Sequence, residues 1–355
     1  MEIVLAVGFV YPQHDNRDRR LALSKLSLVD VNLHRAFGWI PRTRCAGPPG
    51  EAAAGEVRMP AASVTPAILT VRTECSGGPI AQQVEASQDL HGFNRLTILI
   101  HGYNNSACVA QHSYKDFLGL ADVNDASVFA LFGQLCAFYW PGDARFLGPL
   151  SYPNEIPKAK EAARILGEFL EHIAAGRGLP LEIRLVCHSL GNRVALELVK
   201  ALLAANSQTI RFVGALLMAA AVKVSMVEDE QSLEPAALAA GDTYVLFSNS
   251  DKVLHFAFPP GEFLAGEGFG TAVGRTGEPT DVFPRTKSMD GFDHGSYWSG
   301  DATGTQVRAW LGLATSRTID SNSLDENPPA VAVELPQRST PSRSVGASIS
   351  ECHCD

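Results

Sequence analysis

The stretch LVCHSLGNR, residues 185–193, decides how this sequence is interpreted. An apolar run ends at Ser189, and a helical pattern begins at Gly191. A strand that turns directly into a helix holds the residue at the turn in a strained, exposed position, and small residues two places before and after it relieve the backbone crowding. Gly191 meets that requirement, whereas Cys187 stands where glycine is usual. The stretch therefore predicts a strand, a sharp turn that carries a serine hydroxyl, and a helix.

Strand and helix patterns alternate on both sides of this turn. Short apolar strands are predicted at residues 96–100, 135–139, 181–187, 212–220 and 243–248. Helices are predicted from about residue 107 to 120 and at 155–175, 191–205, 234–240 and 302–313. This alternation predicts an α/β fold with a mainly parallel central sheet flanked by helices. In such sheets functional residues gather at the carboxyl ends of the strands, where Ser189 lies.

The two ends of the chain differ from this core, which we place at residues 91–316. Residues 1–90 are predicted to form an N-terminal extension packed on or extending the sheet, with strands at 3–10 and 68–72 and an irregular loop at 46–55. Residues 256–292 are rich in Gly, Pro and Phe, which indicates an insertion or lid. Its Phe-rich part, 256–269, is interpreted either as the lining of an acyl pocket or as a buried loop. Residues 317–355 have the composition of a disordered tail.

Composition limits the partners of the chain. It has 355 residues, 46% of them hydrophobic, and a formal net charge of -9, so a general attraction to nucleic acid or an anionic membrane is not expected. No apolar run reaches the roughly 18 residues of a membrane-spanning helix, and the first residues lack the features of a signal peptide. We therefore expect a cytoplasmic protein.

Cysteine usage bears on disulfides and metals. The seven cysteines are odd in number and scattered, which argues against a disulfide framework. Cys352, His353 and Cys354 offer metal-binding side chains, but no second pair of ligands is nearby in the sequence. We predict no metal and no cofactor.

Two further motifs precede the serine. HGYNNS at residues 101–106 follows the strand 96–100, and YWPG at residues 139–142 ends the next strand. Together with CHSLGNR at residues 187–193, they resemble a bacterial group of uncharacterised α/β hydrolases whose motifs HGYN, WPS or WPG, and HSMGNR or HSLGNR occur in this order. The resemblance covers residues 96–310 approximately. It implies an α/β-hydrolase fold and a serine hydrolase of the carboxylesterase or lipase type.

The partners of the serine follow from the order of residues in α/β hydrolases, which is serine, acid, histidine. Asp251 comes after the late strand 243–248, and His294 lies on a loop before the last helix. In this hypothesis His294 takes the proton of Ser189, while Asp251 orients the imidazole and stabilises its charged form.

Other acids and histidines compete for these two roles. Asp229 and Asp242 come earlier in the chain than Asp251. His255 is only four residues beyond Asp251, which is a short spacing for two triad members on separate loops. Asp251 and His294 are therefore preferred.

Two backbone amides are predicted to form an oxyanion hole. The first is the N–H of Leu190, at the start of the helix after the serine. By the resemblance, the second is the N–H of Tyr103, with that of Asn104 as the next choice. Gly102 would let the backbone approach the substrate closely.

Four more residues belong to the predicted surroundings of the site. Trp140 is expected to shape one wall of the site or to serve in packing. His188 is a candidate substrate contact, although a neighbour of the nucleophile on such a turn is expected to pack or hydrogen-bond beneath the site. His101 is expected to anchor the oxyanion loop, and Arg193 to pair with an acid that the sequence does not identify.

The preferred hypothesis is a serine hydrolase that cleaves an ester or related acyl bond of a small molecule through an acyl-enzyme. An acyltransferase with the same triad and a catalytically silent binding module on a hydrolase fold are the alternatives. A metal-dependent hydrolase has no HExxH or paired-ligand pattern in its favour. The oligomeric state stays open.

Overall fold

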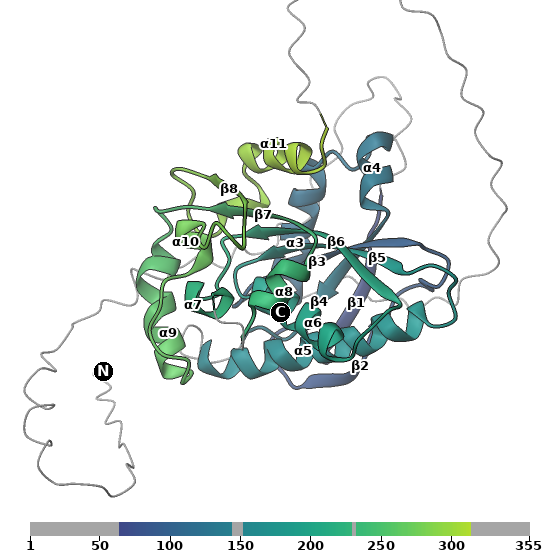
Figure 1. The fold of residues 1–355 in the computed structure, drawn as a ribbon, viewed down its shortest axis with the longest axis horizontal. Helices are drawn as coiled ribbons and strands as arrows, with labels where there is room; N and C mark the ends of the chain where they lie inside the picture. The colour runs from purple at the N-terminus through teal and green to yellow at the C-terminus, as the bar shows by residue number, and fades with distance from the viewer. Residues whose placement is uncertain (1–63, 144–151, 229–231, 314–355) are drawn as a thin grey trace, which may run out of the picture. The chain divides into compact units, whose positions relative to one another are not determined.

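The computed structural model describes residues 64–143, 152–228 and 232–313 (Figure 1). The predicted strand at 3–10, the loop at 46–55, the tail at 317–355 and the rival acid Asp229 lie outside the described residues. The same holds for Cys352 and Cys354.

The described residues form an eight-stranded sheet with the strand order β2-β1-β4-β3-β5-β6-β7-β8. Neighbouring strands are parallel except for β1 and β2, which pair antiparallel at one edge. The strands are β1 (Ala67–Arg72), β2 (Ile80–Ala86), β3 (Arg95–Ile100), β4 (Gln134–Tyr139), β5 (Leu181–His188), β6 (Ile210–Met218), β7 (Asp242–Phe247) and β8 (Arg285–Ser288). The predicted mainly parallel α/β sheet is confirmed.

Helices cover both faces of the sheet (Figure 1). Helices α5 (Tyr152–Ala174), α6 (Gly191–Ala204) and α8 (Glu234–Ala239) supply apolar residues to the core on one face. Helices α3 (Ala107–Leu120), α4 (Ala126–Phe132) and α11 (Asp301–Trp310) supply the core on the other. The shorter elements are α7 (Val224–Val227), the π-helix η2 (Val253–Ala257), α9 (Phe258–Leu264), α10 (Val273–Thr276) and the 3-10 helix η3 (Ser296–Trp298).

Successive side chains of a strand point to opposite faces of the sheet, and helices cover both faces. The central strands therefore bury side chains in two cores, one on each face. In β3, Ile98 and Ile100 enter the core beneath α5 and α6, while Leu99 enters the core beneath α3. In β5, Leu185 lies in the first core and Val186 in the second. The short continuous apolar runs of the sequence thus correspond to the central strands, which are buried on both faces of the sheet.

Several elements were not predicted from the sequence, among them β2, α4 and β8. Strands β1 and β2 both fall within the predicted N-terminal extension and extend the sheet, but only β1 was predicted. Helix α4 occupies a stretch where no helix was predicted. Residues 285–288, within the segment interpreted as an insertion or lid, form β8 and pair with β7. Four residues that begin and end with Arg285 and Ser288 carry too little apolar periodicity to reveal a strand.

The parallel arrangement brings four loops to one edge of the sheet. The loops after β3, β4, β5 and β7 all leave the carboxyl ends of parallel strands. β4, β3 and β5 are adjacent in the sheet, and only β6 separates β5 from β7. They carry the predicted oxyanion loop, the YWPG motif, Ser189 and Asp251. Within the described ranges, no helix has the length and apolar character needed to cross a membrane.

Candidate active site

Ser189 lies in the sharp turn between β5 and α6. Its backbone has a φ of 53°, in the left-handed region that a residue with a side chain rarely adopts. Its amide donates to the carbonyl of Met218 at 3.0 Å, and its carbonyl accepts the amide of Ala221 at 3.2 Å. The strand next to β5 therefore holds the strained turn in place, because strain of this kind persists only where the surroundings enforce it.

The small residue after the serine is required by the packing of the turn. A Cβ atom at Gly191 would lie 2.5 Å from the carbonyl oxygen of His101 and 2.6 Å from that of Ile100. Before the serine, the side chain of Cys187 points into the core and is fully buried, so its sulfur meets apolar neighbours and not the turn. Burial raises the pKa of the Cys187 thiol, which favours an inert, neutral side chain.

Asn192 braces the turn from the first turn of α6. Its side-chain amide is completely buried and donates to the carbonyls of Ser189 at 2.9 Å and Met218 at 3.0 Å. No role was predicted for Asn192 from the sequence, although a polar side chain on an otherwise apolar helix face was a usable signal. Buried polar groups are usually hydrogen-bonded, and here the two bonds of Nδ2 join the turn at Ser189 to the end of β6.

The predicted serine, histidine and acid meet in a continuous line of hydrogen bonds. The Nε2 atom of His294 lies 2.8 Å from Ser189 Oγ, and its Nδ1 atom lies 2.8 Å from Asp251 Oδ2. His294 sits on the loop between β8 and η3, whereas Asp251 follows β7. With Nδ1–H donating to the carboxylate, Nε2 is left as an acceptor for the serine hydroxyl. The arrangement has the geometry of a nucleophile, a base and an orienting acid.

The carboxylate of Asp251 is held in its ionised form. Burial alone would raise its pKa, but the adjacent His294 and the amide of Leu254, which donates to Oδ1 at 3.0 Å, outweigh burial and lower the pKa. The carboxyl group is completely buried, so it is shielded from water and directed only at its hydrogen-bond donors. An ionised acid in this position stabilises an imidazolium at His294.

His188 is buried and contacts the backbone of the third triad candidate, His294. It is 4% exposed, and its Nε2–H donates to the backbone carbonyl of His294 at 2.7 Å. Burial, with a smaller contribution from His294, lowers its pKa to about 3, so the ring is neutral at neutral pH. The alternative that it packs and hydrogen-bonds below the site fits this geometry, and the candidate substrate contact does not.

The loop after β3 approaches the serine closely. A Cβ atom at Gly102 would lie 2.6 Å from the Cβ of Ser189 and 3.1 Å from the Nδ1 of His188. Glycine is therefore needed for the loop to reach the nucleophile. Asn104, the second choice as an oxyanion donor, has a φ of 60° and already donates its amide to the carbonyl of Gly142 at 2.8 Å. The amides of Leu190 and Tyr103 stay the predicted pair of donors.

His101 and Trp140 hold the base of this loop. The His101 imidazole lies 2.9 Å from the Gly102 carbonyl through Nδ1 and accepts the Trp140 amide at Nε2, at 3.3 Å. The Trp140 indole stacks on His101 and donates to its carbonyl at 2.9 Å. The anchoring role predicted for His101 matches this geometry. Trp140 is fully buried, so it serves in packing and forms no wall of the site.

Two of the three rival residues, His255 and Asp242, lie within the described ranges. His255 is exposed on η2, where its ring contacts that of Phe256. Asp242 begins β7 and pairs with Arg285 at 2.5 Å, at the opposite end of the strand from Asp251. The contacts given for these two side chains do not involve Ser189, whereas those of Asp251 and His294 form the hydrogen-bonded line to it.

Arg193 has the acidic partners that the sequence did not identify. It contacts Glu197, one turn further along α6, at 2.8 Å and Glu267 at 3.0 Å. Glu267 follows α9, so this ion pair joins α6, the helix after Ser189, to the segment that follows Asp251.

The Phe-rich part of that segment, 256–269, is neither wholly buried nor wholly exposed. Phe258 is buried, whereas Phe263 and Phe269 stack on each other and are exposed.

The fold and this turn between strand and helix define an α/β hydrolase. A model of the family described as "alpha/beta hydrolase of unknown function (DUF900)" matches residues 80–258, and the chain belongs to that family. The matched residues include the predicted oxyanion loop, Ser189 and Asp251, while His294 lies beyond them. No curated protein matches the sequence.

Solved structures with a similar arrangement share little sequence with this chain. One is an uncharacterized protein from Bacillus cereus ATCC 10987, with 14% identity and a TM-score of 0.35, covering 62% of this chain and 61% of its own. A hyperthermophilic esterase from Pyrobaculum calidifontis has 10% identity and a TM-score of 0.35, and the similarity covers 64% of this chain and 77% of the esterase. Arabidopsis thaliana SOBER1 has 15% identity and a TM-score of 0.34, and the similarity covers 61% of this chain and 98% of SOBER1.

Proposed function

We propose that this protein is a serine hydrolase that cleaves an ester or related acyl bond through a covalent acyl-enzyme. The observation that carries the proposal is the line of hydrogen bonds from Asp251 through His294 to Ser189, at 2.8 Å in both steps. Membership of an α/β-hydrolase family supports the general class of reaction.

The first half of the proposed reaction forms the acyl-enzyme. Ser189 Oγ attacks the substrate carbonyl carbon while its proton passes to His294 Nε2, and the carbonyl oxygen takes up the negative charge. The amides of Leu190 and Tyr103 donate to this oxygen, which lowers the barrier because the donors are already oriented. Collapse of the intermediate expels the alcohol, which takes its proton from His294.

The second half releases the acid. Water gives a proton to His294 Nε2 and attacks the acyl carbon, and Ser189 leaves with that proton when the second tetrahedral intermediate collapses. Throughout both halves Asp251 stays ionised and holds the imidazole with Nε2 toward the serine. The proposed steps use only side chains and amides of this chain.

A fluorophosphonate probe tests the proposal directly. The probe forms a phosphorus–oxygen bond with an activated serine and loses fluoride, so we expect the wild type to be labelled once per chain, at Ser189. Ser189→Ala is expected to abolish labelling, and His294→Ala to slow it by about 10³-fold or more. Ser207→Ala, in the loop after α6, is the matched control and is expected to label like the wild type. A folded wild type that resists labelling would contradict the proposal and favour a binding module.

Substrate preference is measured next with p-nitrophenyl esters of increasing acyl chain length. Product analysis in the presence of an added alcohol separates the two reactions that the triad can support. Free acid as the main product supports hydrolysis, whereas a new ester as the main product supports acyl transfer.

A further inference from the structure

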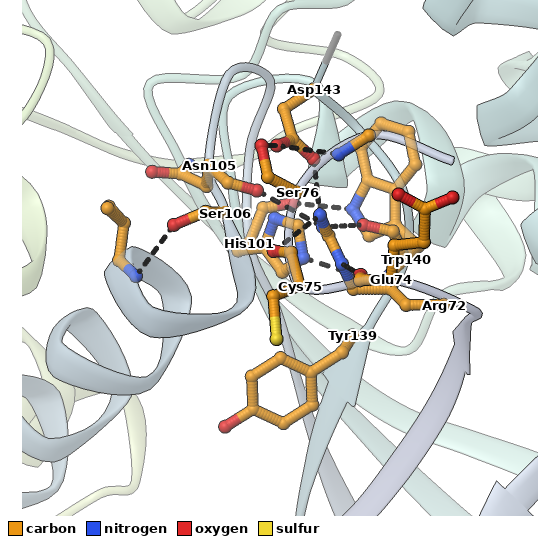
Figure 2. A network of polar contacts seen from close by, with 12 residues as sticks. Arg72, Glu74, Cys75, Ser76, His101, Asn105, Ser106, Tyr139, Trp140 and Asp143 are labelled. Atoms are coloured by element: carbon orange, nitrogen blue, oxygen red, sulfur yellow. Dashed lines mark hydrogen bonds and ion pairs between the residues drawn. The ribbon is translucent and has the colours of Figure 1, made fainter. Parts of the chain in front are cut away.

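A buried ion pair connects the loops that surround the proposed oxyanion hole. Arg72, the last residue of β1, lies 2.5 Å from Asp143, which follows the YWPG motif. Their side chains are only 3% and 5% exposed. Figure 2 shows the Arg72 guanidinium between Asp143, Trp140 and Asn105. Neither charged residue was singled out from the sequence.

Every N–H group of the Arg72 guanidinium has an acceptor. Nε donates to the Glu74 carbonyl at 3.1 Å. Nη1 donates to the carbonyls of Trp140 at 2.7 Å and Asn105 at 3.2 Å. Nη2 donates to the Cys75 carbonyl at 3.1 Å and to Asp143. A guanidinium has five N–H donors in one plane, so this environment matches arginine and no other side chain.

The Asp143 carboxylate completes the network from the opposite side. Its Oδ1 accepts from Arg72, while its Oδ2 accepts from the Ser76 hydroxyl at 2.8 Å and the Gly77 amide at 3.1 Å. The pair therefore joins three loops, namely residues 73–77 after β1, 101–106 after β3 and 140–143 after β4. The network is drawn in Figure 2.

The middle loop is the one that carries the proposed oxyanion donor. Asn105, whose carbonyl accepts from Arg72, donates its side-chain amide to the carbonyls of Gly102 at 3.2 Å and Tyr103 at 3.3 Å. The Asn104 amide, in a left-handed conformation, is fixed to Gly142 beside Asp143. The carbonyls of this loop are thus held by donors of the network, which sets the direction of the intervening amides.

We propose that Arg72 and Asp143 are a positioning pair that holds the oxyanion loop in its catalytic geometry. This inference rests on the proposed function. The pair touches no reacting atom and acts through Asn105 and Trp140 on the amide of Tyr103. Arg72 lies outside the segment that the family model matches, residues 80–258, whereas the loop it orients lies inside.

Arg72→Lys and Asp143→Asn test the proposal, because lysine keeps the charge without the planar fork and asparagine keeps the shape without the charge. With a p-nitrophenyl ester we expect kcat to fall about 10- to 100-fold, less than for complete loss of an oxyanion donor, while KM changes less than about 3-fold. The pH–rate profile is expected to keep its midpoint, because the hydrogen bonds of the triad are untouched.

Arg95→Lys is the matched control. Arg95 also pairs with a carboxylate, Glu182, at 2.5 Å, but it begins β3 and so lies at the opposite end of the strand from the oxyanion loop. We expect its kcat to stay within about 2-fold of the wild type. Equal kcat in Arg72→Lys and Arg95→Lys, both folded, overturns the proposal, as does a shifted pH midpoint in Arg72→Lys.

Two further measurements keep the test decisive. If Arg72→Lys and Asp143→Asn do not fold, Ser76→Ala removes a single hydrogen bond to Asp143, and an unchanged kcat in that variant overturns the proposal. The rate of amide hydrogen exchange in residues 101–106 reports on the order of this loop independently of catalysis. We expect faster exchange in Arg72→Lys and not in Arg95→Lys. Absence of labelling at Ser189 in the folded wild type would refute the proposed function and with it the catalytic role of the pair. Normal labelling with unchanged exchange in Arg72→Lys would refute the positioning role and leave the proposed function standing.

Discussion

Gly102→Ala gives the sharpest test of the geometry between the oxyanion loop and the nucleophile. The added Cβ would lie 2.6 Å from the Cβ of Ser189 and 3.1 Å from both Nδ1 and the carbonyl oxygen of His188. Because carbon atoms are at their optimal separation at about 3.5–4.0 Å, the loop must retreat by about 1 Å. The neighbour that it meets is a backbone-fixed turn, so the loop and not the turn is expected to move.

The size of the effect follows from that displacement. A misplacement of about 1 Å costs about 10²-fold in rate, and loss of one oxyanion donor costs about 10²–10³-fold, or about 2.7–4 kcal/mol. We therefore expect kcat for Gly102→Ala to fall about 10²-fold with little change in KM. Overpacking is expected to lower the free energy of unfolding by about 1–3 kcal/mol.

The assay is steady-state hydrolysis of a p-nitrophenyl ester, measured well below the melting temperature and corrected for active sites by titration. Gly92→Ala is the control, since no atom lies within 4 Å of its added Cβ, and it is expected to match the wild type. A folded Gly102→Ala variant with kcat within about 3-fold of the wild type would refute the close approach of this loop to the serine as the basis of catalysis.

Two other predictions concern stability. The Tyr114 hydroxyl donates to the Phe138 carbonyl at 2.6 Å and accepts the His101 amide at 2.8 Å, so Tyr114→Phe removes two buried hydrogen bonds. We expect it to lower the free energy of unfolding in urea by about 1–3 kcal/mol, and a loss below about 0.5 kcal/mol would contradict this. Burial, aided by a neighbouring carboxylate and opposed by the hydrogen bond from Tyr152, raises the pKa of Glu262 from 4.5 to about 7. Between these values the folded state binds more protons than the unfolded state, so this group makes the wild type less stable as pH rises. The melting temperature of Glu262→Gln minus that of the wild type is therefore expected to be larger at pH 8 than at pH 5. An equal difference at the two pH values would contradict the raised pKa of Glu262.

The sequence by itself determined the fold class and the order of the site residues. Apolar runs of strand length, alternating with helical periodicity, are local properties that survive without tertiary context. The turn at Ser189 is equally local, because a strand followed at once by a small residue and a helix restricts the backbone. Asp251 could be proposed because it follows a strand with a readable period, and His294 because it precedes the last predicted helix, in the order of residues typical of α/β hydrolases.

The tertiary structure alone decided how these parts hold one another. Arg72 and Asp143 are 71 residues apart, and nothing in the sequence near either one indicates that the two form an ion pair. Likewise, only the packed loop shows that the Asn104 amide is already engaged and that His188 supports His294. Hydrogen bonds between distant segments depend on orientation to within an ångström, and residue type and spacing do not encode that orientation.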